Sequence, residues 1–221
     1  MSFTLFTDRL GGFSQGDFSS LNLALHVGDD DDAVQANRDL IAREYGACVY
    51  MNQVHGNEVH VVTDLIDHTP TCDALITTVP GITLAVMTAD CIPLLLSSAS
   101  VVAAVHVGRR GLVNGVARKT IETMRELGAS TISAQLGPSI CGTCYEVDVE
   151  TFDEVQRVHP VARSQTERGT PALDLAKALV ADLKEFSIDT MVDKRCTNED
   201  VELFSYRKSQ RTGRQAGLIR L

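Results

Sequence analysis

The segment 101–107 most constrains the fold of this chain, because it reads Val-Val-Ala-Ala-Val-His-Val and is apolar at almost every position. Successive side chains of a strand point to opposite faces, so a strand with this pattern must be covered on both faces and lie near the centre of a sheet. Three short apolar segments precede it, at 74–77, 83–88 and 93–97. Together these four segments predict a β-sheet with a buried centre.

Outside this region, apolar residues repeat at helical spacing. Residues 31–45 follow aspartates that favour a helix N-terminus, and they carry apolar side chains three or four positions apart. The same spacing predicts a helix over 113–127, which Gly128 ends, and another over 173–186. Each of these helices must bury its apolar face. The pattern therefore predicts an α+β layered fold in which helices cover mixed β-sheets, with residues 1–221 forming a single domain.

Two β-branched segments, 49–54 and 58–62, flank the turn sequence His55-Gly56-Asn57. Short strands on either side of a glycine- and asparagine-containing turn are typical of a β-hairpin. We therefore expect these two strands to pair with one another.

The charge balance limits the partners of this chain. It has 20 lysines and arginines against 29 aspartates and glutamates, a formal net charge of -9. Nucleic acids and anionic membranes select basic surfaces, so neither is an expected partner. No apolar stretch approaches the roughly 18 residues of a membrane-spanning helix, and the first residues lack the pattern of an export signal. The expected location is the cytoplasm, where the six cysteines would be thiols or metal ligands.

Three potential ligands of a soft metal lie at predicted strand ends or turns: His55, Cys91 and His106. Imidazole and thiolate are groups that Zn2+ prefers, and three protein ligands leave one tetrahedral position open for water or substrate. Their intervals of 36 and 15 residues match no compact metal motif, so a buried thiol with two turn histidines stays an open interpretation. A third interpretation makes Cys91 a nucleophile with either histidine as its base.

Other polar motifs allow both a functional and an ordinary interpretation. Cys141-Gly-Thr-Cys144 is compatible with redox chemistry or half of a zinc site, but without a second such motif we expect a pair of loop thiols. Gly108-Arg-Arg-Gly111 suits an anion or a solvated helix entry, as does the arginine-rich tail 205–214. Asp90 either orients a metal ligand or caps a strand end.

Taken together, several motifs resemble the YfiH-type, laccase-domain family. They occur in the family's order from about residue 8 to the C-terminus: Asp8-Arg-Leu-Gly-Gly, Ser20-Leu-Asn-Leu-Ala-Leu-His-Val-Gly-Asp, Gln53-Val-His-Gly, Met87-Thr-Ala-Asp-Cys-Ile-Pro, Val105-His-Val-Gly-Arg-Arg-Gly, Leu136-Gly-Pro, Tyr145-Glu-Val, Cys196-Thr, Phe204-Ser-Tyr-Arg-Lys and Thr212-Gly-Arg. The resemblance implies an α/β/β/α-layered fold. It also implies a metal site, usually zinc, with ligands that match His55, Cys91 and His106 here.

The resemblance further implies a purine nucleoside phosphorylase acting on adenosine, inosine and methylthioadenosine, with adenosine deaminase activity. On that basis the three ligands are also the expected catalytic residues, and purine nucleoside and phosphate the expected substrates. We expect Arg9, Asn22 and His26 to line the nucleoside side, and Arg109 or a tail arginine to bind phosphate. At Arg110 the family generally has Trp, which puts base stacking and substrate preference in question.

Other activities remain open. By comparison with multicopper oxidases, such an enzyme would need roughly ten histidines and a cysteine in several copper centres, since ligand softness and geometry decide the metal, whereas this chain has six histidines in all. Copper on the same three ligands would therefore support phenol oxidation only as a side activity. The alternatives are a metal-independent Cys-His hydrolase or amidase and a non-catalytic quality-control protein of cell-wall or division machinery. The macromolecular partner of such a protein is not identified by the sequence.

Overall fold

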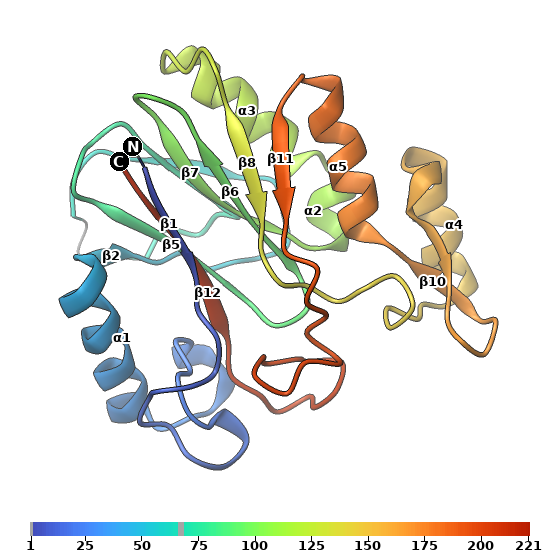
Figure 1. Ribbon diagram of the computed structural model, residues 1–221, viewed down its shortest axis with the longest axis horizontal. Helices are drawn as coiled ribbons and strands as arrows, with labels where there is room; N and C mark the ends of the chain where they lie inside the picture. The colour runs from blue at the N-terminus through green and yellow to red at the C-terminus, as the bar shows by residue number, and fades with distance from the viewer. Residues whose placement is uncertain (1, 66–68) are drawn as a thin grey trace.

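Two packed β-sheets form the centre of the computed structural model, which describes residues 2–65 and 69–221 (Figure 1). The larger sheet contains, in spatial order, β11 (Asp189–Val192), β8 (Ser133–Leu136), β6 (Ile92–Ser97), β7 (Val102–Val107), β4 (Ala74–Thr77) and β3 (Val59–Val62). The smaller sheet contains β1 (Phe3–Phe6), β12 (Gln215–Arg220), β5 (Thr83–Thr88) and β2 (Cys48–Val49). Most neighbouring strands are antiparallel, and parallel pairs lie at the edges.

Strand β7 is buried on both faces, as its sequence predicts. Val102 and Ala104 belong to the apolar cluster between the two sheets, which also contains Leu84 of β5. Ala103 and Val105 belong to the cluster on the opposite face, under the helices. Because β7 lies between β6 and β4, it is a central strand of the larger sheet.

Helices cover the outer face of the larger sheet. They are α2 (Arg109–Val113), α3 (Val116–Glu126) and α5 (Leu175–Glu185), while α4 (Val149–Val158) packs beside the hairpin of β9 (Arg163–Gln165) and β10 (Pro171–Leu173) (Figure 1). Helix α3 buries Val116, Ile121 and Met124 in the same cluster as the outward-facing side chains of β7. The amphipathic spacing in the sequence therefore corresponds to this contact.

Helix α1 (Asp31–Tyr45) covers the smaller sheet, where Ile41 packs against side chains of β5 and β12. It begins where the Asp30 carboxylate accepts a hydrogen bond from a backbone N–H of the first turn, and it ends at Gly46, whose positive φ favours glycine. These are the predicted bounds. None of the helices in the described ranges is long and apolar enough to cross a lipid bilayer. The layers therefore run helix, sheet, sheet, helices, and the predicted α+β fold is confirmed.

The predicted hairpin at 49–62 is wrong. Strand β2 pairs with β5 in the smaller sheet, whereas β3 pairs with β4 in the larger sheet. The turn sequence His55-Gly56-Asn57 therefore lies in a connection that passes from one sheet to the other. The buried carboxylate of Asp73 accepts hydrogen bonds from the backbone N–H groups of this connection, which replace the pairing of a hairpin.

Candidate functional site

The structure brings His55, Cys91 and His106 together at one end of the two sheets. His55 lies in the connection between the sheets, Cys91 lies between β5 and β6, and His106 lies in β7. Because β6 and β7 are antiparallel and Pro93 pairs with His106, the start of β6 places Cys91 beside the end of β7. The three side chains offer ligand atoms that all lie within 4.8 Å of one another.

The two rings and the thiol face a common point. The Cys91 Sγ lies 3.9 Å from His55 Nε2, and the two imidazole rings meet edge to face with centroids 4.6 Å apart. Gly108 makes this approach possible, because a Cβ there would lie 2.9 Å from the ring of His55 and 3.0 Å from Cys91 Sγ. A side chain at position 108 would therefore separate the thiol from the rings.

Asp73 holds two members of the cluster in place, and no pattern in the sequence pointed to this residue. Its carboxylate is fully buried and accepts a hydrogen bond of 2.8 Å from Nδ1 of His106. It also accepts backbone N–H bonds from His55 at 2.9 Å and Gly56 at 2.7 Å. In the neutral ring this bond places the proton on Nδ1 and leaves the Nε2 lone pair for a metal, an arrangement common behind metal-binding histidines.

Charges within the cluster favour ionised groups. Burial raises the pKa of Asp73, but hydrogen bonds from His106 and from the backbone of Gly56 and His55 outweigh it and lower that pKa. Burial likewise opposes ionisation of Cys91, yet His106 and His55 lower the pKa of its thiol to about 6. The Cys91 thiolate and Asp73 in turn raise the pKa of His106 to about 9, although burial lowers it. Cys91 is therefore held as the thiolate, the form that binds metals and acts as a nucleophile.

The cluster opens into a cavity of about 500 Å³. The wall combines the three candidate ligands with tyrosines and arginines from two loops. Tyr206, Arg207 and Arg214 come from the tail 205–214, and Tyr145 comes from the loop before α4. The lining residues are His26, Gln53, His55, Met87, Thr88, Ala89, Asp90, Cys91, His106, Tyr145, Tyr206, Arg207 and Arg214. The cavity therefore has a soft-metal ligand set, aromatic walls and cationic side chains in one place.

The predicted substrate-binding residues do not all reach this cavity. His26 lines it, whereas Arg9 and Asn22 are absent from its described lining. Arg9 donates to the carbonyl of Ser19 at 2.6 Å, and Asn22 is fully buried, where its Oδ1 accepts the backbone N–H of Arg214 at 2.9 Å. Asn22 therefore holds the backbone that carries Arg214.

Arg109 lies in an adjacent hollow of about 480 Å³, which shares Tyr145 and Arg207 with the first cavity. It forms an ion pair with Glu154 at 2.6 Å. Its neighbour Arg110, at the position where the resemblance implies Trp, has an exposed side chain outside the described cavity lining. The aromatic faces of the cavity come instead from tyrosines 145 and 206.

Asp90 connects the site to the C-terminal loop, which runs from β11 to β12. Its backbone has φ of 100°, a region that residues other than glycine rarely adopt. Its carboxylate accepts hydrogen bonds from the hydroxyls of Thr197 and Ser205, both at 2.7 Å, and from the backbone N–H of Arg207 at 2.6 Å. These contacts account for a strained turn directly before Cys91, and they assign Asp90 a positioning role for the loop.

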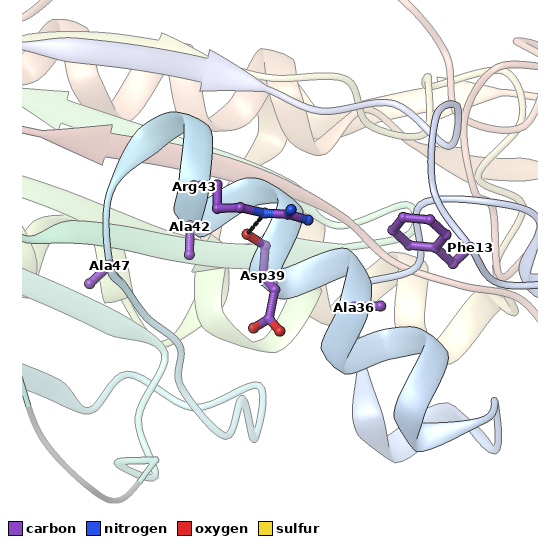
Figure 2. Close-up of a pocket in the computed structure, with 6 residues that line it drawn as sticks. All are labelled: Phe13, Ala36, Asp39, Ala42, Arg43 and Ala47. Carbon is purple, nitrogen blue, oxygen red and sulfur yellow. Dashed lines mark hydrogen bonds between the residues drawn. The ribbon is translucent and has the colours of Figure 1, made fainter.

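A larger but unrelated hollow runs along α1 (Figure 2). Its lining consists of Phe13, Ala36, Asp39, Ala42, Arg43 and Ala47, and Arg43 bends back to donate to the carbonyl of Asp39 at 3.2 Å. Three of these side chains are single methyl groups, and none of the three clustered residues lines this hollow. Volume alone therefore does not identify the functional site.

Comparison with known proteins agrees with the fold and the motifs. Residues 3–221 match the family described as multi-copper polyphenol oxidoreductase laccase. The protein named purine nucleoside phosphorylase SCO2081, from Streptomyces coelicolor, is 45% identical over 225 residues, which cover 97% of this chain and 93% of that protein.

Two solved structures have the same fold. Neisseria meningitidis protein NMB0706 superposes with a TM-score of 0.92 and 36% identity, covering 100% of this chain and 94% of the other. The YfiH protein of Bacillus licheniformis superposes with a TM-score of 0.89 and 28% identity, covering 100% and 92%. The chain therefore belongs to the multi-copper polyphenol oxidoreductase laccase family and is of the YfiH type.

Proposed function

We propose that this protein is a zinc-dependent purine nucleoside phosphorylase that also deaminates adenosine. The observation that carries the proposal is a His-Cys-His cluster, held by a buried carboxylate, at the base of a cavity lined by tyrosines and arginines. The printed name of the Streptomyces coelicolor relative supports the same activity. Adenosine, inosine and methylthioadenosine are the proposed substrates.

His55, Cys91 and His106 are the proposed metal ligands and catalytic residues. Two imidazoles and a thiolate form the donor set that zinc prefers, and the hydrogen bond from His106 Nδ1 to Asp73 leaves Nε2 to coordinate once metal binding displaces its proton. A zinc ion held there would supply Lewis acidity toward a polar atom of the substrate. Copper would fit the same nitrogen and sulfur donors, which keeps a weak phenol-oxidising activity as a testable alternative.

Arg207 and Arg214 are the proposed phosphate-binding residues. Both line the cavity, and guanidinium groups bind phosphate through paired charge-assisted hydrogen bonds. Phosphorolysis requires phosphate to be held next to the ribose carbon while the purine departs. Tyr145 and Tyr206 offer aromatic surfaces to the nucleoside from the same wall.

The second candidate function is a metal-independent Cys-His hydrolase. The observation in its favour is the lowered pKa of Cys91 beside two histidines, because a thiolate next to imidazole is a nucleophile in its own right. The two functions differ in their need for metal and in their products.

A product assay with and without chelator separates these functions. Incubation with adenosine and phosphate is expected to yield adenine and ribose 1-phosphate, with inosine from deamination, as identified by mass spectrometry. We expect removal of the metal by a chelator to abolish both reactions and Zn2+ to restore them. Turnover that persists in the metal-free protein and is lost on thiol alkylation would instead support the hydrolase.

Replacing Arg207 with glutamine is expected to raise the KM for phosphate about tenfold, because one charge-assisted contact to the anion is lost. The side chain is exposed, so folding should be retained. Arg211→Gln is the matched control, since Arg211 belongs to the same loop but its guanidinium lies near Asp17, outside the described cavity lining. Steady-state kinetics with phosphate varied tests this prediction, and an equal KM in the two variants would contradict it.

A further inference from the structure

A second cluster of soft-metal ligands lies where two loops meet beside the cavity. It consists of Cys141, Cys144, Cys196 and Glu199, whose ligand atoms all lie within 4.8 Å of one another. The first two residues form the Cys-x-x-Cys motif, which from the sequence alone was expected to be a pair of loop thiols. The other two come from a segment 55 residues further along the chain, so the sequence spacing did not reveal them.

The two halves of the cluster have the same local backbone geometry. In the first turn, the carbonyl of Cys141 accepts hydrogen bonds from the N–H groups three and four residues ahead, at 3.1 and 3.0 Å. In the second turn, the carbonyl of Cys196 accepts from the N–H groups three and four residues ahead, at 3.1 and 2.9 Å. Each turn therefore presents two ligands with the spacing i and i+3, which is the usual way in which paired turns surround a structural zinc ion.

Contacts between the two turns bring these ligand pairs together. Ser139 and Cys196 form a parallel bridge, so the turns run side by side. The backbone N–H of Cys141 donates to Cys196 Sγ at 3.3 Å, and the thiol of Cys144 lies 3.4 Å from a carboxylate oxygen of Glu199. Backbone N–H bonds to sulfur stabilise thiolates in metal sites, because they orient the ligand and offset its charge.

We propose that Cys141, Cys144, Cys196 and Glu199 bind a structural zinc ion. Three sulfurs and one carboxylate oxygen complete a tetrahedron, in which zinc-sulfur bonds of about 2.3 Å place the sulfurs about 3.8 Å apart. The 4.8 Å limit on the present separations means that only small side-chain movements are needed. Binding releases the protons of the three thiols, and with four protein ligands the ion has no open position for substrate.

The position of this site indicates that the ion would join two segments next to the cavity. Tyr145, directly after Cys144, lines the cavity, and Thr197, directly after Cys196, donates to the Asp90 carboxylate at 2.7 Å. The backbone N–H of Ile140 donates to the Asp90 carbonyl at 3.0 Å. An ion bound by both turns therefore links the segment that carries Tyr145 of the cavity wall to the segment that contacts Asp90, the residue directly before Cys91.

Residue-resolved alkylation of the wild-type protein tests the site without any mutation. The full-length protein, purified under reducing conditions with zinc, is treated with iodoacetamide before and after addition of a chelator, and each cysteine is quantified by peptide mass spectrometry. We expect Cys141 and Cys144 to be protected until the chelator is added. Cys48 is the internal comparison, because it is partly buried and lies outside both clusters, so its alkylation should not depend on the chelator.

Metal content provides the second test. We expect two zinc ions per wild-type chain, and one in Cys141→Ser/Cys144→Ser and in Cys91→Ala, one for each cluster. The first of these variants is expected to lose roughly 5–10 °C in Tm, because a ligand bound only by the folded state is lost. Glu199→Gln should release this zinc to a competing chelator sooner than the wild type, whereas the nearby exposed Glu202→Gln should not.

The two tests also separate this site from the proposed active site. Loss of zinc in Cys91→Ala with protection of Cys141 and Cys144 intact supports the structural site, whatever nucleoside activity is found. Alkylation of Cys141 and Cys144 in the zinc-loaded wild type at the same rate with and without the chelator would overturn the proposal. A disulfide among Cys141, Cys144 and Cys196 in that protein would also overturn it.

Discussion

Replacing Cys91 with alanine is expected to reduce nucleoside turnover by about 10²- to 10⁴-fold, the range seen when a group acting directly on the reacting atoms is removed. The change removes the only sulfur of the His55, Cys91 and His106 cluster, and with it the thiolate that both histidines stabilise. Adenine, ribose 1-phosphate and inosine are measured in single-turnover and steady-state reactions. Metal content is measured in the same samples.

Cys48→Ala is the control for loss of a thiol elsewhere in the chain. Cys48 lies in the short strand β2 of the smaller sheet and belongs to neither ligand cluster. Full activity in that variant and loss in Cys91→Ala would support the proposed site. His106→Ala should behave like Cys91→Ala, and unchanged turnover in both would remove the cluster from the chemistry.

Replacing Asp73 with asparagine is expected both to destabilise the protein and to weaken metal binding. The carboxylate accepts hydrogen bonds from one imidazole and from backbone N–H groups, and an amide NH2 group placed among these donors cannot accept. A buried donor left without a partner costs about 1–3 kcal/mol. Loss of the group that orients His106 should lower metal affinity by about 10- to 100-fold.

Urea unfolding and competition with a metal-binding dye measure these two effects separately. Asp193→Asn is the comparison, because Asp193 forms a partly exposed ion pair with Arg195 at 2.7 Å. Such a pair contributes about 0–1 kcal/mol, and it contacts neither histidine. If Asp73→Asn kept wild-type metal affinity while losing stability, Asp73 would be a structural residue of the connection and would not tune His106.

The elements with strong local patterns could be predicted from the sequence alone. The apolar run at 101–107 corresponds to the central strand β7, and the spacing after Asp30 corresponds to α1. These predictions succeed because burial on both faces, helical periodicity and end-capping involve neighbouring residues. The three clustered residues were candidates from residue type and strand-end position, but intervals of 36 and 15 residues carry no recognisable metal spacing, so the family resemblance was needed to favour a metal site over the alternatives.

Strand pairing, by contrast, is a long-range property. The sequence placed 49–54 against 58–62, but the two segments pair in different sheets, and the connection between them folds around Asp73. Asp73 meets His106 only because β4 pairs with β7, which aligns Ala74 with Val105. An isolated acidic residue before an apolar strand gives no sign of that register.

The sequence by itself determined the layered α+β class, the central strand, the main helices and the residue types able to bind a soft metal. Only the tertiary structure decided which of those residues meet. His26 and two tail arginines line the cavity, whereas Arg9 and Asn22 make supporting contacts outside its described lining. Cys196 and Glu199 lie beside the Cys-x-x-Cys turn. The physical reason is that periodicity and capping act between neighbours, whereas a site depends on the register and crossing of strands far apart in the chain.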